Sequence, residues 1–376
     1  MNQIVIGFVD GSQYMQTFVQ QAFEIAAART GISVRFDQNP RSNPQGREAP
    51  QGREAPHLLV YSYFGDNHKK YNCTKIFLSG EPSDISRISM SLLLDCKDVP
   101  RFRPAHVPFF YLPFYVTSFG ERFKNKPEDL IKVKTAEADE KKILLTKTKF
   151  CAFLYSQEID FRNQLFDMLS KYRKVDGIGK CRNSSGSGQF DRQTYQPGVC
   201  TYNDLAVEKY KPYKFVICCE NSRHQGYITE KIISAMLAGC IPIYLGAPDV
   251  TQHFNPKSFV SVASFPNWEH AIEFVKKLDQ NNSMYLEMQN EPWFVDNKLP
   301  ECFNPERLAL TLQPFLTNPG TGSALRSIQR QRIAPRMNSN QVTQTRTLMI
   351  RRIEPMSAAR PHPRSTTNSR VINRRK

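Results

Sequence analysis

Long hydrophobic runs are missing from this 376-residue chain. No stretch approaches the roughly 18 consecutive apolar residues that a membrane-spanning helix needs. The amino terminus, MNQIVIGFVDG, has neither the basic region nor the small-residue cleavage site of a signal peptide. The sequence therefore predicts a cytoplasmic protein without a leader or a transmembrane anchor.

Metal-site and disulfide patterns are scarce as well. The chain has no Cys-x-x-Cys pair and no Cys/His spacing that would suit zinc. Its nine cysteines are an odd number, and Cys218 and Cys219 stand side by side in an apolar run. These features favour free thiols in a reducing compartment over a disulfide framework. We therefore expect neither a metal site nor stabilising disulfides.

Positive charge is distributed unevenly along the chain. The formal net charge is +16, and residues 321–376 hold thirteen Arg or Lys with a single acid, Glu354. This segment has no periodicity and is rich in Arg, Ser, Thr, Asn and Pro, so residues 320–376 are predicted to be disordered. A basic tail favours weak association with an anionic membrane surface. It contains no aromatic residue for base stacking, which argues against nucleic acid as its partner.

Short apolar runs alternate with segments of helical period over the rest of the chain, which predicts an α/β protein with parallel sheets. We expect strands at residues 4–9, 32–36, 57–63, 75–79, 150–155, 213–219 and 241–245. Helices are expected at residues 14–29, 137–145, 161–173, 229–238, 267–278 and 304–315. Residues 39–56 contain PQGREA twice in tandem and read as a flexible insertion.

The richest stretch is YKFVICCENSRHQGYITEKIISAMLAGCIPIYLGAPDV, residues 213–250. It predicts a buried strand, a polar loop, a helix and a second buried strand. Glu220, Asn221 and Ser222 fall at the carboxyl end of the first strand, where open parallel sheets bind ligands. Thr229 is a candidate N-cap, with Glu230 and Lys231 in the first helical turn. Because free N–H groups point out of a helix N-terminus, this turn could hold a phosphate.

The same stretch resembles the donor-binding motif of the α1,3-fucosyltransferase family, glycosyltransferase family 10, whose pattern is close to FENS followed by DYxTEK. Here the pattern reads Cys219-Glu220-Asn221-Ser222 and then Gly226-Tyr227-Ile228-Thr229-Glu230-Lys231. Cys219 replaces the usual Phe and Gly226 the frequent Asp. The likeness continues through residues 253–278, as in bacterial members. It implies donor-binding roles for Glu220, Asn221, Ser222, Tyr227, Thr229, Glu230 and Lys231.

Two upstream residues fit the resemblance. Arg162, in KTKFCAFLYSQEIDFRNQLF, matches the family position whose guanidinium meets the donor diphosphate, and a fork of N–H donors suits phosphate oxygens. Glu81, in KIFLSGEPSD, matches the Glu that is the family's candidate general base. The attacking acceptor hydroxyl must lose a proton to such a group.

The resemblance implies a GT-B-like architecture of two Rossmann-type domains facing a central cleft. We expect an acceptor-binding domain at residues 1–140, a donor-binding domain at residues 147–319, and the basic tail after it. The implied reaction is an inverting transfer of L-fucose from GDP-fucose to an acceptor glycan, α1,3 to N-acetylglucosamine. It would serve glycan biosynthesis, such as protein glycosylation.

No cofactor is implied. The chain lacks the Asp-x-Asp pair that holds a divalent cation in single-Rossmann glycosyltransferases, although a divalent metal stays compatible with the sequence. Two alternatives stay open. One is a GT-B transferase that uses another nucleotide sugar, such as GDP-mannose. The other is a protein whose Arg-rich tail binds nucleic acid or a membrane surface.

Overall fold

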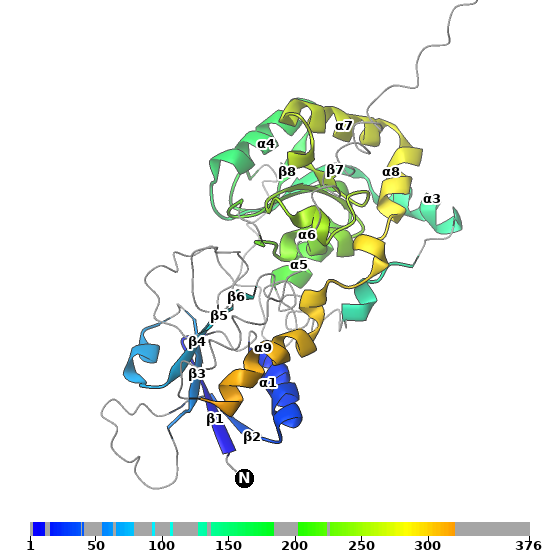
Figure 1. The fold of residues 1–376 in the computed structure, drawn as a ribbon. Coiled ribbons are helices and arrows are strands. Elements are labelled where there is room, and N and C mark those ends of the chain that lie inside the picture. The colour runs from blue at the N-terminus through cyan, green and yellow to red at the C-terminus, as the bar shows by residue number, and fades with distance from the viewer. Residues whose placement is uncertain are drawn as a thin grey trace, which may run out of the picture. The chain divides into compact units, whose positions relative to one another are not determined.

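The computed structural model describes residues 3–11, 16–38, 40, 55–62, 65–78, 92–94, 106–107, 127–133, 137–183, 202–223 and 226–319. All of them belong to one compact unit, residues 1–336. They form two parallel β-sheets with helices packed on them (Figure 1). The predicted α/β class with parallel sheets is confirmed. Most of the insertion at 39–56 and the whole tail at 320–376 lie outside the described residues.

The first sheet is built from the amino-terminal part of the chain. Its strand order is β2 (Ser33–Asp37), β1 (Gln3–Val9), β3 (Leu58–Tyr61), β4 (Thr74–Leu78), β5 (Leu92–Leu94) and β6 (His106–Val107). Every neighbouring pair is parallel. Helix α1 (Gln16–Thr30) connects β1 to β2, and Gly31 ends it with a φ of 67°, a left-handed conformation that glycine adopts without steric penalty.

The second sheet has the order β11 (Val260–Ser261), β10 (Ile241–Leu245), β9 (Tyr213–Cys219), β7 (Lys149–Phe153) and β8 (Val175–Gly177). Its pairs are also parallel. All seven residues of β9 are buried, as expected for a central strand that is covered on both faces. The residues of β9 are for this reason apolar or aromatic, with the exception of Lys214. The ammonium group of Lys214 bonds to Asp279.

Helices of the second half are α3 (Glu137–Thr146), α4 (Asp160–Ser170), α5 (Tyr202–Tyr210), α6 (Glu230–Leu237), α7 (Trp268–Gln280) and α8 (Asn282–Asn290). Single 3₁₀ turns are η2 (Asn67–Lys70), η3 (Pro127–Leu130), η5 (Val250–Gln252), η6 (Val262–Ser264), η7 (Val295–Asn297) and η8 (Glu301–Phe303). The asparagines Asn267 and Asn281 cap α7 and α8, each accepting a bond from the N–H three residues on. The apolar faces of α5 and α6 pack into the core beneath β7 and β9.

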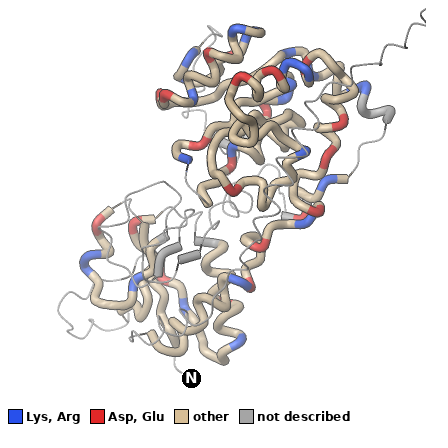
Figure 2. The backbone as a smooth tube through the Cα atoms, turned by 45° about the horizontal axis from the view of Figure 1, so that its top comes forward, with Lys and Arg blue, Asp and Glu red and all other residues tan. Residues whose placement is uncertain are grey.

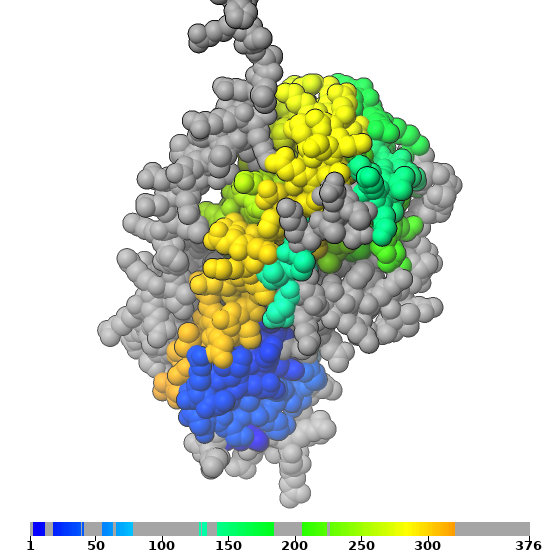
Figure 3. Space-filling view, turned by 90° about the vertical axis from the view of Figure 1, so that its right-hand side faces the viewer, coloured from blue at the N-terminus to red at the C-terminus, as the bar shows by residue number. Residues whose placement is uncertain are grey.

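The last described helix, α9 (Pro305–Thr317), packs on α1 rather than on the second sheet. Figure 3 shows its orange surface against the blue surface of the amino-terminal residues. An ion pair between Arg29 and Glu306 joins the two helices. The apolar face of α9 shares a core with β1, β3 and α1, and its members there are Leu308, Ala309, Leu312, Phe315 and Leu316. This packing crosses the domain boundary expected near residue 147, and the domain limits stay a prediction.

Acidic and basic residues are interspersed over the described backbone (Figure 2). Within the described ranges, no helix combines the length and apolarity needed to span a bilayer. The described part of the chain therefore carries charges of both signs, whereas the charged residues of 321–376 are basic apart from Glu354.

Candidate functional site

The candidate site lies at the carboxyl edge of the second sheet. Strands β8 and β9 flank β7 on opposite sides, so the strand order reverses between β7 and β9. Open α/β sheets bind ligands at such a switch point, where the loops after two neighbouring strands separate. The loop after β7 leads to Arg162, and the loop after β9 carries Glu220, Asn221 and Ser222. The topology thus brings together residues that are about sixty positions apart in the sequence.

Arg162, in the first turn of α4, is almost completely buried at 2 % exposure. One terminal nitrogen, Nη2, donates to the carbonyl oxygens of Cys219 (3.3 Å) and Glu220 (3.1 Å) and to Asn221 Oδ1 (3.0 Å). Nη1 donates to the Gln157 carbonyl at 3.3 Å. All these acceptors are uncharged. No carboxylate of the described chain forms an ion pair with Arg162, and its Nε has no partner. A buried cation without an anionic partner is costly, so the position suits an anion.

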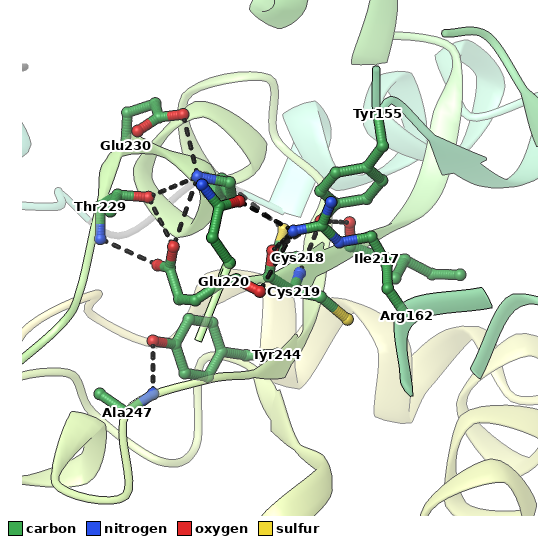
Figure 4. Close-up of polar contacts among 12 residues, drawn as sticks. Tyr155, Arg162, Ile217, Cys218, Cys219, Glu220, Thr229, Glu230, Tyr244 and Ala247 are labelled. Atoms are coloured by element: carbon green, nitrogen blue, oxygen red, sulfur yellow. Dashed lines mark hydrogen bonds and ion pairs between the residues drawn. The ribbon is translucent and has the colours of Figure 1, made fainter. Parts of the chain in front are cut away.

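The guanidinium of Arg162 stacks on the ring of Tyr155 (Figure 4). The Arg162 Cζ atom lies 3.8 Å from the centroid of the Tyr155 ring. The buried phenol accepts a hydrogen bond from the Cys219 N–H at 2.6 Å and donates to the Ile217 carbonyl at 2.9 Å. Burial raises the pKa of Tyr155 well above its ordinary value, so the hydroxyl stays protonated. Sequence reasoning did not single out Tyr155, because an aromatic residue at the end of an expected strand reads as core.

Glu220 is fully buried and is bonded to Thr229, the residue before α6. Its Oε1 accepts from the Thr229 N–H at 2.8 Å and its Oε2 from the Thr229 hydroxyl at 2.7 Å. Lys231 Nζ lies 3.4 Å from Glu220 Oε2 and 2.9 Å from Thr229 Oγ1. Burial raises the pKa of Glu220, and the charge of Lys231 opposes that rise. In this structure Glu220 ties the loop to the helix, and direct contact with a donor stays a prediction.

Thr229 is the N-cap of α6, as expected, but its hydroxyl does not bond to the first-turn N–H groups. It donates to Glu220 instead. A cap side chain ordinarily satisfies one of these N–H groups. Because the Thr229 side chain bonds to Glu220, it does not cap the first turn of α6, and the charge of Lys231 lies beside that turn. The arrangement suits a phosphate or diphosphate group.

Three predicted site residues carry a buried polar atom that has no hydrogen-bond partner within the described part of the chain. They are Arg162 Nε, Ser222 Oγ and Glu230 Oε2. Buried polar groups in folded proteins are nearly always bonded, so each such orphan calls for an explanation. Their presence at one sheet edge is explained if a polar ligand supplies the missing partners. Tyr227, by contrast, is 1 % exposed and packs in the core that α1 and α9 share.

Two glycines shape the loops around Glu220. Gly226 has a φ of 76°, and its N–H donates to both oxygens of Asp249, at 3.0 and 3.1 Å. Glycine at the place of the motif's Asp is thus explained by the left-handed backbone. At Gly246, a Cβ atom would lie 2.5 Å from Glu220 Cγ, so a larger residue would displace the carboxylate.

The predicted base, Glu81, lies outside the described residues. That no metal is required, with a divalent metal still compatible with the sequence, also stays a prediction. All other predicted site residues are described, and Arg162, Glu220, Asn221, Thr229 and Lys231 are joined by the contacts given above.

Comparison with known proteins places the site in a family. Residues 144–299 match the family model described as glycosyltransferase family 10 (fucosyltransferase), C-terminal. A predicted fucosyltransferase of Acanthamoeba polyphaga mimivirus is 34% identical over 223 residues, which are 59% of this chain and 34% of the relative. The α-(1,3)-fucosyltransferase FucT of Helicobacter pylori is 36% identical over 170 residues, 45% of this chain and 32% of the relative. The chain thus spans about a third of the length of these two relatives.

Comparison with solved structures leads to the same family of enzymes. A crystal structure of an α1,3-fucosyltransferase superposes with a TM-score of 0.60 at 22% identity, covering 84% of this chain and 90% of the other. At this identity the match shows a common fold, the GT-B fold of that enzyme. The family match itself covers the whole of the site, from β7 to the turn after α8. Residues 144–299 of the chain are thus a domain similar to the carboxyl-terminal domain of glycosyltransferase family 10, the fucosyltransferases.

Proposed function

We propose that the chain is an inverting fucosyltransferase that moves L-fucose from GDP-fucose to a hydroxyl of an acceptor glycan, α1,3 to N-acetylglucosamine. The observation that carries the proposal is the buried guanidinium of Arg162, which has only uncharged acceptors in the described chain and lies at the switch point of a family 10 domain. A nucleoside diphosphate would supply the anion that this cation lacks. GDP-fucose is the donor that the similarity to this family supports.

The proposed reaction is a single displacement at the anomeric carbon of fucose. The acceptor oxygen bonds to that carbon as the bond to the β-phosphate oxygen breaks, and GDP leaves with the bonding electrons. Glu81 takes the acceptor proton. Arg162 and Lys231 stabilise the negative charge that grows on the leaving diphosphate. Asn221, Ser222, Tyr227 and Glu230 are proposed to hold the nucleoside and the sugar, with Glu220 and Thr229 fixing the loop behind them.

Acceptor-stimulated release of GDP tests the donor and the reaction together. The purified protein is given GDP-fucose with N-acetyllactosamine, and GDP-mannose and UDP-galactose serve as donor controls. We expect release from GDP-fucose alone, and activity that persists in a chelator. Release of GDP from GDP-mannose instead would show that GDP-mannose, and not GDP-fucose, is the donor. Failure to bind any guanine nucleotide would overturn the assignment of the donor site. Proton NMR of the product would read the anomeric configuration and the linkage, which test inversion and the α1,3 position.

The rival function, a tail-driven binding protein, is separated by truncation after Pro319. The carbonyl of Pro319 accepts a bond from the Thr74 hydroxyl at 2.6 Å, so the cut is placed beyond it. We expect the shortened protein to keep GDP binding and transfer. Sedimentation of both forms with anionic vesicles tests the proposed weak membrane association of the tail. Loss of all activity on truncation would favour the rival.

A further inference from the structure

A second group of polar side chains lies at the carboxyl edge of the first sheet. Asp10 follows β1 and Ser62 follows β3, and these two strands are direct neighbours. Strand β2 pairs with the other side of β1, so this edge is the switch point of the first sheet. It is the position at which an open α/β sheet takes a ligand. None of these residues belongs to the site on the second sheet.

Asp10 is a buried carboxylate held by four hydrogen bonds. Its side chain is 1 % exposed. Oδ1 accepts from the Asn67 backbone N–H (3.1 Å) and side-chain amide (2.9 Å), and Oδ2 accepts from the His68 N–H (2.7 Å) and Nδ1 (2.9 Å). Burial raises the pKa of Asp10, but the bonds from His68 and Asn67 outweigh it, so the pKa is lowered. The group is an anion whose oxygens are already occupied, which disfavours a metal or a second anion there.

The imidazole of His68 is fixed in two ways. Nδ1 lies against Asp10, and the ring stacks on Tyr61 with centroids 4.2 Å apart and planes at 23°. The backbone N–H groups of Asn67 and His68 are enough to bond the η2 turn to Asp10. The additional bond from the ring therefore serves to orient the imidazole. When the ring is neutral, the bond places the proton on Nδ1 and leaves Nε2 as an acceptor. Within the described chain Nε2 has no hydrogen-bond partner, and the side chain is 17 % exposed.

Ser62 supplies an independent observation at the same edge. The residue is 1 % exposed, and among the described residues its hydroxyl has no hydrogen-bond partner. A Cβ atom on Gly11 would lie 3.9 Å from Ser62 Cβ, which places Ser62 beside the residue that follows Asp10. A buried hydroxyl is nearly always bonded. A ligand with hydroxyl groups would satisfy Ser62 and offer a proton to His68 Nε2.

We propose that His68 and Ser62 form a hydroxyl-binding subsite for the acceptor saccharide, with Asp10 as the positioning residue that orients the imidazole. The acceptor role rests on the proposed function. A neutral polyol fits this chemistry, because the subsite combines one acceptor nitrogen with one hydroxyl and carries no unsatisfied charge. His68 Nε2 accepts a hydrogen bond from a sugar hydroxyl, and no proton is transferred.

Two substitutions of His68 separate its role in acceptor binding from its role in holding the η2 turn against Asp10. His68→Asn keeps an amide donor near the place of Nδ1, and so keeps the bond to Asp10, but removes Nε2. His68→Gln places its amide near Nε2 and gives up the bond to Asp10. We expect His68→Asn to raise the KM for N-acetyllactosamine about tenfold, as loss of one hydrogen bond predicts, with the KM for GDP-fucose unchanged. His68→Gln should recover part of the loss. Lys69→Ala, on the exposed side of η2, is the matched control and should behave as the parent protein.

Direct binding is measured by NMR on protein with ¹⁵N-labelled histidine, without donor. N-acetyllactosamine should move the Nε2 signal of His68, identified by its loss in His68→Asn, and leave that of the exposed His270 in place. A shift at His68 in a protein that does not transfer fucose would sustain the subsite and reject the fucosyltransferase proposal. Fucose transfer to N-acetyllactosamine with no shift, and with His68→Asn equal to the parent, would overturn the subsite. Equal melting temperatures show that each variant is folded.

Discussion

The guanidinium of Arg162 rests on the ring of Tyr155, 3.8 Å from its centroid, and both contact the end of β9. The aromatic face stabilises the cation and fixes its plane in an interior where no carboxylate of the described chain pairs with it. Tyr155 is therefore a positioning residue for the proposed donor site. It acts through Arg162 and through the backbone of Cys219.

Replacing Tyr155 by Phe and by Leu separates these two functions. Tyr155→Phe keeps the ring but leaves the Cys219 N–H without its acceptor, so we expect a loss of about 1–3 kcal/mol in unfolding free energy and little change in GDP affinity. Tyr155→Leu also removes the ring face and should weaken GDP binding about tenfold more than Tyr155→Phe. Urea unfolding and calorimetric titration with GDP measure both effects. Equal GDP affinities for the two variants would show that the ring does not position Arg162.

Arg162→Lys keeps the charge and removes the fork of donors. We expect the dissociation constant for GDP to rise roughly 10- to 100-fold, because an ammonium cannot hold a diphosphate and bond to the loop after β9 at the same time. Arg182→Lys is the control, since Arg182 is exposed and pairs with Asp167 at the surface. Titration with GDP at two salt concentrations gives the comparison. Unchanged affinity in Arg162→Lys would contradict the diphosphate assignment.

Thr229→Val tests the link between Glu220 and α6. The substitution leaves Glu220 Oε2 without the Thr229 hydroxyl and takes a partner from Lys231. We expect a loss of about 1–3 kcal/mol in stability and weaker GDP binding. Thr229→Ser keeps the hydroxyl and should stay close to the parent in both measurements. If Val and Ser behave alike, the hydroxyl does not organise the site.

Asp279 provides a prediction about acid stability. Its buried carboxylate accepts from Lys214 at 3.0 Å, Arg173 at 2.9 Å and Tyr172 at 3.0 Å. Burial raises the pKa of Asp279, but these bonds outweigh it and the folded-state pKa is lowered from 3.8. The stabilisation is therefore present in full above the unfolded-state pKa and is lost as the pH falls through the folded-state pKa.

Asp279→Asn should cost about 3 kcal/mol at neutral pH, because Lys214 is left buried without its counter-charge. The difference from the parent should shrink as the pH is lowered below about 4. Urea unfolding at several pH values measures it. Glu273→Gln, which breaks an exposed pair with Lys276, should change stability by less than about 1 kcal/mol. A deficit that does not depend on pH would point to packing rather than charge.

Glu81→Gln tests the proposed base. A general base contributes about 10²- to 10⁴-fold, so turnover should fall by at least a hundredfold while GDP affinity is retained. Asp84→Asn, three residues on, is the matched control. Loss of GDP binding in Glu81→Gln would argue against the assignment, and unchanged turnover would remove Glu81 from the mechanism.

Sequence reasoning reached much of the second sheet because its signals are local. The apolar run of β9 and the Thr-Glu-Lys start of α6 each specify an element without knowledge of its partners. It missed β8 (Val175–Gly177), since three residues with a single large apolar side chain make no periodic pattern. It also missed α5 and α8, whose polar faces obscure the helical period.

The interior of the site could not be predicted in the same way. A motif shows that Glu220, Thr229 and Lys231 belong together, but not that the carboxylate bonds to Thr229 and lies fully buried. The stacking of Tyr155 on Arg162 depends on the turn between β7 and α4 and on two rotamers. The spacing of residues in the sequence encodes neither this turn nor these rotamers. Contacts of this kind follow from tertiary packing, which one sequence does not specify locally.

The packing of α9 on α1 also sets an order of events during synthesis. The strands and helices of the second sheet all precede residues 305–317 in the sequence, whereas the core around α1 stays incomplete until those residues are made. The half of the chain that is made first is thus finished last. A chain that ends before α9 would lack the side chains of α9 that complete the core shared by β1, β3 and α1.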